Sequence, residues 1–550
     1  MSDAERQLRL EDFHDSVPLP RGPEDVIRIT VDLTDFEGSA DALAVLGEYV
    51  VASNPMVSRL TYLFRSRPTL QQAPLKETDY EFLIYGGENP DRRISHEVRQ
   101  QISLTLLPAL RDAEGDLNNW RRSPLAPLLQ AFAANTDRDR LEQVTAEVTS
   151  ATRAVAQLPD IRDLANRLQA RLEEIVGSQH AVATSLGFSP TDAERLVRAL
   201  RLFIDGGKRS ISEASLGTSN LIYLCLWILE LERQVADGNK SHNLLAIEEP
   251  EAHLHPHLQR LIFRNFLHIR GEMTPEQASK ANTILLTTHS PHIISVAPLR
   301  SLVVLRKSSD GTSTEAVSTA NVELTESVVK DLERYLDVTR GEIVFAKGVL
   351  LVEGPAEEFI VPALGKLLGY DFDQLGITVC SVGGTDFEPY VRLLGAGGLR
   401  LPFAVITDFD PTRDGHSLGV SRVRKLLSLI TGDAALSSVD EATVKRRGGR
   451  EGIFLNDYTL EVDLFHTGQH EKICQALVEL TTNRAAQERA SRWQADPSSL
   501  DENQFLKDIM GIGKGRFAQR LASLLRPGAC PGYIKKAIKY VTKLSDQSDS

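Results

Sequence analysis

Residues 348–358 read Gly-Val-Leu-Leu-Val-Glu-Gly-Pro-Ala-Glu-Glu, and this stretch decides the fold of the second half of the chain. An apolar run ends in Glu353, a glycine turn follows, and Glu357 falls in the first turn of a predicted helix. Strands that are apolar throughout and alternate with helices predict a parallel α/β sheet, because such strands are buried on both faces.

The same alternation continues downstream, with strands predicted at 377–382 and 402–407 and helices at 356–368, 385–395 and 417–431. The second strand leads to Gly-Gly-Thr-Asp at 383–386, and the third ends in Asp408-Phe-Asp410. From residue 466 onward the pattern is helical.

Three strand-end acids are expected at one edge of this sheet, because the carboxyl ends of parallel strands meet there. They are Glu353, Asp408 and Asp410. If the third strand persists, the spacing of two residues puts both aspartates on the same side. Clustered carboxylates repel unless a cation compensates, and oxygen ligands favour Mg²⁺ or Mn²⁺ over zinc. The sequence therefore predicts a magnesium or manganese site.

Upstream, residues 243–256 read Asn-Leu-Leu-Ala-Ile-Glu-Glu-Pro-Glu-Ala-His-Leu-His-Pro, the most specific segment of the chain. The segment resembles the Walker B motif of ABC-type ATPases, in which the first acid, here Glu248, holds Mg²⁺ and the second, Glu249, polarises the attacking water. Neighbouring strand residues point to opposite faces, so two such roles require a turn at this point, which Pro250 can supply.

Two further segments resemble nucleotide-binding parts of the same ATPases. Thr-Thr-His-Ser-Pro at 287–291 follows the next buried strand, and His289 matches the switch histidine that contacts the γ-phosphate. Ser215-Leu-Gly217-Thr-Ser-Asn opens a helix whose backbone N–H groups could bind an anion, like the signature loop that acts on ATP bound by a second subunit. An ordinary capped helix is the alternative for this segment.

No string of the form GxxxxGK[ST] occurs in the chain. We therefore expect ATP to bind this chain poorly or not at all, although the resemblance implies ATP as a ligand. Two explanations stand: the start of the chain is misassigned, or the natural protein has lost nucleotide hydrolysis. We favour a missing N-terminal segment, because the Walker B, signature and switch residues keep a recognisable form.

The rest of the first half predicts α/β structure with a helical insertion. A strand is expected at 26–35, a mixture of helix and loop at 92–135, and a strand pair within 198–213. Strands at 243–247 and 283–287 alternate with helices at 216–235 and 257–270. Residues 137–185 are expected to form a charged helical hairpin broken at Pro159. A solvated arm and a dimerisation arm are equally good interpretations of this hairpin.

The composition excludes several classes of protein. A net charge of -13 argues against a non-specific DNA coat, but local basic patches can still serve a nuclease. The four cysteines lack CxxC spacing and indicate buried thiols of a cytoplasmic protein. The N-terminus is polar, and the apolar run around 221–231 is too short to cross a membrane, so no membrane association is expected.

The acids of the second half resemble the Toprim pattern, with one Glu after the first strand and DxD after the third. ABC-type ATPase motifs followed by Toprim resemble the OLD (overcoming lysogenization defect) family of nucleases, over about residues 26–540. The strings that carry this resemblance are EEPEAHLHP, TTHSP, LLVEGPAEE, ITDFD, YTLEVDL and GIGKGRFAQ. The resemblance implies an N-terminally truncated ATPase-like domain at 1–340, a Toprim domain at 341–465, and a helical region at 466–550 that completes the nuclease.

The resemblance also implies metal-dependent hydrolysis of DNA phosphodiesters by a two-metal site. The implied metal ligands are Glu353, Glu357, Asp408, Asp410 and Glu461, with Asp414 as a weaker candidate. Lys514, at a predicted helix start, would neutralise charge on the scissile phosphate. Homodimers, a possible partner protein, and a role in phage defence or DNA processing are implied as well.

DNA would need cationic contacts, and three basic runs are loose candidates. These are Arg422, Arg424 and Lys425; Lys445, Arg446, Arg447 and Arg450; and Lys535, Lys536 and Lys539. Two other functions stay open. One is a topoisomerase- or primase-like use of Toprim, and the other is a catalytically silent scaffold or regulatory pseudo-ATPase subunit.

Overall fold

The computed structural model describes residues 8–549, apart from some short internal stretches. Those not described are 39, 71, 95–97, 99–100, 177–181, 185, 187–191, 238–239, 241, 269–282, 309–310, 337, 413–416, 434–435 and 437–438. The chain forms two compact units, one within Met1–His255 and Ile269–Thr288, the other within Pro256–His268 and His289–Ser550. No helix in the described part is long and apolar enough to cross a membrane.

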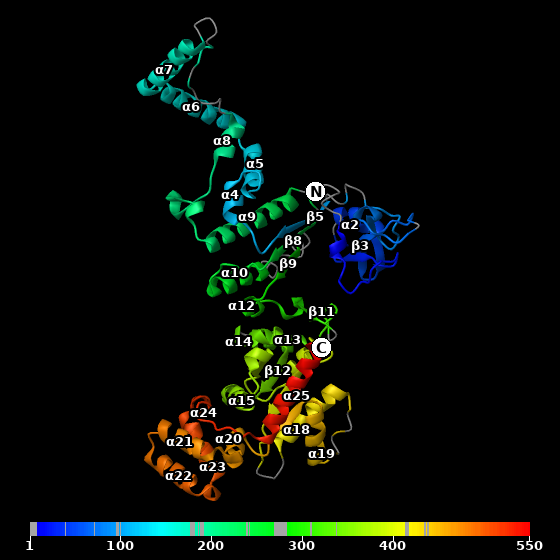
Figure 1. Cartoon of the computed structure of the whole chain (residues 1–550), viewed down its shortest axis with the longest axis vertical. Coiled ribbons are helices and arrows are strands. Elements are labelled where there is room, and N and C mark those ends of the chain that lie inside the picture. Colours follow the sequence, from blue (N-terminus) through cyan, green and yellow to red (C-terminus); the bar gives the residue numbers. More distant parts are fainter. Residues whose placement is uncertain are drawn as a thin grey trace. The chain divides into compact units, whose positions relative to one another are not determined.

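The first unit contains an antiparallel sheet near the N-terminus (Figure 1). It consists of β1 (Ile27–Leu33), β2 (Val50–Ser53), β3 (Met56–Ser66) and β4 (Tyr80–Gly86), with β3 pairing with the other three strands. The strand expected at 26–35 is confirmed. The rings of Phe13, Phe64 and Tyr80 pack together as a small core.

The unit's second sheet is parallel, in the order β5-β8-β9, and it presents the ATPase-like motifs. Its strands are β5 (Ile102–Leu107), β8 (His242–Glu248) and β9 (Thr283–Thr287). The strands expected at 243–247 and 283–287 are confirmed. The expectation of only helix and loop at 92–135 is wrong, because Ile102–Leu107 pairs in parallel register with residues 242–247.

Helices and one short hairpin complete the first unit. They are α2 (Ala40–Leu46), α4 (Ala113–Asn118), α5 (Leu125–Asn135), α6 (Arg138–Ala156), α7 (Pro159–Val176), α8 (Ala193–Ala199), β6 (Phe203–Ile204), β7 (Arg209–Ser210) and α9 (Leu216–Ala236). The predicted helical hairpin is confirmed as α6 and α7, which lie next to each other in Figure 1. Its break is at Pro159, the first residue of α7.

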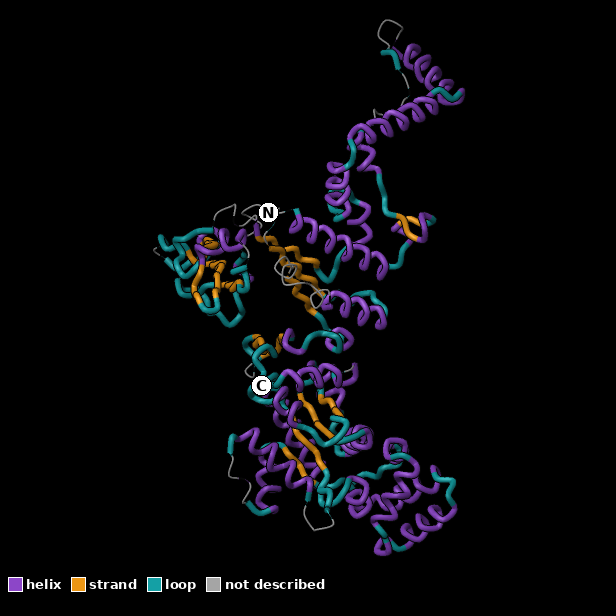
Figure 2. The backbone as a smooth tube through the Cα atoms, turned by 180° about the vertical axis from the view of Figure 1, so that it is seen from behind, coloured by secondary structure: helices purple, strands orange, loops and turns teal. Residues whose placement is uncertain are grey.

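The second unit is built on a parallel sheet in the order β13-β12-β14-β15. Its strands are β13 (Ile377–Ser381), β12 (Gly348–Val352), β14 (Phe403–Thr407) and β15 (Ile453–Leu455). Every residue of β12 is buried. Leu350 and Val352 pack with the core that includes α15 (Pro355–Leu367) and α25 (Gly532–Asp549). Val349 and Leu351 face the core of α17 (Glu388–Leu394) and α18 (Leu418–Thr431). The predicted parallel α/β sheet is therefore confirmed, with helices on both faces (Figure 2).

The helices of this unit follow the expected order. Those before and around the sheet are α10 (Pro256–His268), α12 (Pro291–Ile294), α13 (Glu326–Tyr335), α14 (Val338–Gly341), α15 (Pro355–Leu367), α16 (Phe372–Leu375), α17 (Glu388–Leu394), α18 (Leu418–Thr431) and α19 (Glu441–Arg450). A hairpin of β10 (Val303–Lys307) and β11 (Thr314–Ser318) precedes α13. The helical C-terminal region comprises α20 (Leu460–Leu464), α21 (His470–Leu480), α22 (Arg484–Ala495), α23 (Glu502–Ile512), α24 (Lys514–Ala522) and α25 (Gly532–Asp549).

Candidate metal centre

The predicted strand-end acids meet at the carboxyl edge of the sheet in the second unit. Glu353 follows β12 and Asp408 follows its neighbour β14. The Oε1 atom of Glu353 accepts hydrogen bonds from the Thr407 hydroxyl at 2.6 Å and from the Asp408 backbone N–H at 2.8 Å. Thr407, the last residue of β14, therefore holds the carboxylate of Glu353, the residue that follows β12.

Asp408 is buried, and its carboxylate accepts a hydrogen bond from Asn456. Asn456 comes directly after β15, is fully buried, and donates from its amide nitrogen to Asp408 Oδ1. Its amide oxygen accepts the backbone N–H of Phe409 at 2.6 Å. Burial, followed by the neighbouring charges of Glu353, Glu357 and others, raises the pKa of Asp408 well above its ordinary value. The sequence pattern alone assigns no role to Asn456.

Asp410 does not continue the strand. β14 ends at Thr407, and Asp410 has a φ of 47°, in the left-handed region. The strand does not persist to Asp410, so the condition for aligning Asp408 with Asp410 along a strand is not met. Asp410 instead turns its carboxylate to Arg422 on α18.

Arg422 faces the acids, although the sequence suggested a loose contact to DNA. Its guanidinium forms ion pairs with Glu353 and Asp410 and also donates to the Thr407 hydroxyl. Its side chain is 14% exposed, so it is part of the cluster. No sequence signal separated Arg422 from the basic residues beside it.

Glu357 lies in the first turn of α15, where its carboxylate accepts the backbone N–H of Gly354 at 3.1 Å. Burial raises the pKa of Glu357 to about 7, and the charges of Glu461 and Glu353 add to this effect. Glu357 therefore ionises near neutral pH, where a nearby cation would favour its charged form.

Glu461 and Lys514 come from the helical C-terminal region. Glu461 lies on α20 and is buried, and its Oε1 atom is 3.3 Å from the Lys514 Nζ atom. Its other oxygen, Oε2, is buried without a hydrogen-bond partner in the described part of the chain. Burial alone would lower the pKa of Lys514, but Glu461 and Asp408 outweigh it, and the pKa is raised. Lys514 is the first residue of α24, as the sequence predicted.

The donor chemistry of this cluster fits a divalent cation. It joins five carboxylates with two cationic side chains, Arg422 and Lys514. Burial first, and then the neighbouring carboxylate charges, raise the pKa values of Glu357 and Asp408, and Glu461 Oε2 is an acceptor without a partner in the described part of the chain. Within the described residues, however, no three acidic, histidine or cysteine side chains are already arranged as a metal-binding group.

Most of the other basic candidates are engaged in surface contacts. Lys425 pairs with Glu388, Lys445 with Asp457, and Arg447 with Asp433. Arg424 donates to the carbonyl of Val439 and Arg446 to the hydroxyl of Thr443. Arg450 at the end of α19 and Lys535, Lys536 and Lys539 on α25 are exposed. Asp414 lies outside the described residues.

In the first unit, the paired acids Glu248 and Glu249 lie at the end of β8. The predicted turn is present, because Glu249 has a φ of 40° and its carbonyl accepts the N–H of Ala252 at 3.0 Å. Glu248 Oε2 accepts the backbone N–H of Ala109 at 3.2 Å. His289 belongs to the second unit and directly precedes the turn into α12.

The start of α9 is occupied by contacts within the chain. The Ser215 hydroxyl accepts the N–H of Thr218 at 3.2 Å and so caps the helix. A Cβ atom at Gly217 would lie 2.6 Å from the carbonyl oxygen of His253. The absence of a side chain at Gly217 therefore lets the start of α9 pack closely against the loop that follows the paired acids.

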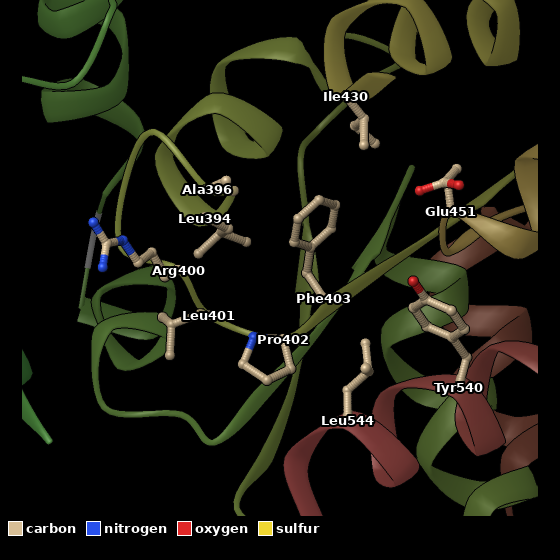
Figure 3. A pocket seen from close by; sticks show the side chains of 11 residues that line it. Leu394, Ala396, Arg400, Leu401, Pro402, Phe403, Ile430, Glu451, Tyr540 and Leu544 are labelled. Carbon is tan, nitrogen blue, oxygen red and sulfur yellow. The ribbon is translucent and has the colours of Figure 1, made fainter. Parts of the chain in front are cut away.

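A pocket of about 440 Å³ lies at the amino end of β14 (Figure 3). Pro402 and Phe403, at the amino end of β14, line it together with Leu394 and Tyr540. Because Asp408 follows the opposite end of the same strand, this pocket is not part of the cluster.

Both halves of the chain are similar to known protein families. A family model described as an AAA ATPase domain matches residues 75–294, and one described as "Overcoming lysogenization defect protein-like, TOPRIM domain" matches residues 344–410. An "OLD nuclease" of Thermus scotoductus (strain ATCC 700910 / SA-01) is 27% identical over 59% of this chain and 60% of that protein. An "Old nuclease" of Escherichia phage P2 is 24% identical over 50% of this chain and 45% of that protein.

Among solved structures, the C-terminal region of the Burkholderia pseudomallei OLD protein is 40% identical. The match covers 36% of this chain and 99% of that one, with a TM-score of 0.35. The chain spans about half to three fifths of the length of the two curated relatives.

Proposed function

Since the chain belongs to the family of OLD proteins, we propose that it is a divalent-metal-dependent DNA endonuclease. The observation that carries this proposal is the cluster of five carboxylates at the carboxyl edge of the β13-β12-β14-β15 sheet. Three of these carboxylates are buried, and carboxylates in this excess over cationic groups are stable together when a cation compensates their charge. Oxygen donors of this kind suit Mg²⁺ or Mn²⁺.

The residues of this centre have different proposed roles. The residues that would hold the metals are Glu353, Glu357, Asp408, Asp410 and Glu461. Two bound cations would supply an activated water and stabilise the leaving oxygen of a phosphodiester. Thr407 and Asn456 fix the orientation of the Glu353 and Asp408 carboxylates.

Lys514, held 3.3 Å from Glu461, would place its charge beside the phosphate as negative charge develops there. Hydrolysis is favoured over strand passage, because strand passage needs a tyrosine that reaches the DNA backbone. The tyrosine beside the acids, Tyr533, has a buried hydroxyl.

Nicking of supercoiled plasmid by the full chain tests this proposal. Wild-type protein in Mg²⁺ or Mn²⁺ without ATP should nick the plasmid, and EDTA or Asp408→Ala should abolish the reaction. Asp373→Asn, which alters an exposed aspartate of the same unit, is the matched control and should leave nicking unchanged. If folded wild-type protein nicks in neither metal, the nuclease proposal fails and the scaffold function remains.

We further propose that the chain acts as a cytoplasmic homodimer in phage defence or DNA processing, with the α6–α7 hairpin as the dimerisation arm. Leu164, Leu168 and Ile175 are exposed along α7 at spacings of four and seven residues, which suits a partner helix. Light scattering should give a dimer mass for the wild type and a monomer mass for Leu164→Glu with Leu168→Glu. An unchanged mass would rule out the arm as the interface.

The division into an ATPase-like domain at 1–340, a Toprim domain at 341–465 and a helical region at 466–550 is part of this proposal. The match of an AAA ATPase model to residues 75–294 supports an ATPase ancestry for the first half. Weak or absent ATP binding remains the prediction for this chain, and ATP turnover at a rate ordinary for ABC enzymes would contradict it.

A further inference from the structure

Arg422 joins two carboxylates that come from different strand ends. One guanidinium nitrogen donates to Glu353 Oε1 and to the Thr407 hydroxyl, and the other donates to Asp410 Oδ2. The arginine therefore links the residue after β12 to the loop after β14. Charge-assisted hydrogen bonds from one planar guanidinium to two carboxylates are directional and stronger than hydrogen bonds between neutral groups.

The position of Arg422 is fixed by the way α18 begins. Ser417 caps the helix by accepting the N–H of Val420 at 3.1 Å, and its hydroxyl also donates to the carbonyl of Phe409. A Cβ atom at Gly419 would lie 2.2 Å from the Asp408 carbonyl oxygen, so the helix start lies directly against the loop. Side chains on a helix lean toward its N-terminus, which directs Arg422 back to the acids.

The guanidinium contacts one oxygen of each of two carboxylates that would hold a metal. Glu353 Oε1 already accepts from the Thr407 hydroxyl, the Asp408 N–H and Arg422. Asp410 is the second partner of the arginine. A divalent cation binds through carboxylate oxygens and would repel a neighbouring guanidinium. Arginine and metal therefore compete for Glu353 and Asp410.

We propose that Arg422 is an internal counterion that holds Glu353 and Asp410 in the absence of metal and releases them when a divalent cation binds. This inference rests on the proposed function, because it takes both carboxylates as metal ligands. It explains how the acids stay together in a folded chain before metal arrives. It also makes Arg422 a positioning residue that lowers the affinity of the site for metal.

Isothermal titration calorimetry of the metal-free full chain with Mn²⁺ measures the affinity of the site for the metal and tests the inference. Arg422→Gln should bind Mn²⁺ on the order of tenfold more tightly than the wild type, since the metal no longer breaks a charge-assisted contact. Lys425→Gln removes one positive charge from the same helix without touching the acids, and its affinity should equal that of the wild type. Equal or weaker binding by Arg422→Gln would overturn the inference.

Thermal unfolding gives a second readout if Arg422→Gln folds less well. In EDTA this variant should unfold at a lower temperature than the wild type, and Mn²⁺ should raise its unfolding temperature by a larger amount. An equal gain in both proteins would also overturn the inference.

Glu353→Gln separates failure of the inference from failure of the proposed function. If Glu353→Gln binds Mn²⁺ as the wild type does, the metal site is elsewhere and both ideas fail. If Glu353→Gln loses binding while Arg422→Gln matches the wild type, the inference on Arg422 alone fails.

Discussion

Replacing Glu357 by glutamine should stabilise the metal-free protein at pH 8 and stabilise it by a clearly smaller amount at pH 5. Glu357 is buried, and burial raises its pKa from an ordinary 4.5 to about 7. The folded state therefore disfavours the ionised carboxylate, and it loses stability as the pH rises from 4.5 to about 7. The glutamine amide oxygen can still accept the Gly354 N–H, so the helix cap is retained.

The size of the effect follows from the two pKa values. Ionisation of Glu357 costs the folded state about 3 kcal/mol at pH 8 and about 1 kcal/mol at pH 5, relative to the unfolded chain. For a unit of this size, about 3 kcal/mol corresponds to a rise on the order of 6 °C in the unfolding temperature.

Differential scanning calorimetry in EDTA measures this difference directly. Wild type and Glu357→Gln are compared at pH 5 and pH 8, with Glu358→Gln as the control for the chemical change at the next residue. Added Mn²⁺ at pH 8 should stabilise the wild type more than the variant, because the metal favours the ionised carboxylate. A Glu357→Gln effect of the same size at both pH values, or a loss of stability at pH 8, would refute the reasoning.

Three further changes test individual contacts. Lys514→Met removes the cation beside Glu461 and should slow plasmid nicking about 100-fold without weakening Mn²⁺ binding; weaker Mn²⁺ binding would contradict a role at the phosphate. Asn456→Leu leaves the buried Asp408 carboxylate without its donor and should cost about 3 kcal/mol in urea unfolding, whereas a neutral effect would show that the contact is dispensable. Gly217→Ala places a Cβ 2.6 Å from a backbone carbonyl and should destabilise the first unit by about 2 kcal/mol, and unchanged thermal unfolding of that unit would argue against close packing there.

The sheet of the second unit could be predicted because its strands are short apolar runs bounded by glycine turns and acids. β12, β13 and β14 lie within a residue of their expected positions, and parallel order brings Glu353 and Asp408 together. The strand β5 could not be predicted, because its pairing partner β8 is about 140 residues further along the chain. The strand itself is a run of only six residues, Ile-Ser-Leu-Thr-Leu-Leu, and helix α4 begins soon after it, at Ala113.

The inner contacts of the cluster depend on side-chain direction, which a sequence pattern does not specify. In the sequence, Arg422, Arg424 and Lys425 look alike as basic residues of one helix. The orientation of α18 about its axis directs Arg422 to the acids, whereas the other two contact Val439 and Glu388. The strand β14 ends at Thr407, and the left-handed backbone at Asp410 departs from the longer strand that the DxD spacing suggested. Likewise, the role of Asn456 depends on β15 lying beside β14, a pairing formed by three residues.

The central claim is that the carboxyl edge of the β13-β12-β14-β15 sheet is a divalent-metal centre. Anomalous scattering from crystals of the full chain grown with Mn²⁺ tests this claim most directly. We expect manganese peaks about 2.0–2.2 Å from carboxylate oxygens of Glu353, Asp408 and Asp410, with the guanidinium of Arg422 displaced from them. Manganese bound only elsewhere, with Arg422 still between Glu353 and Asp410, would contradict it.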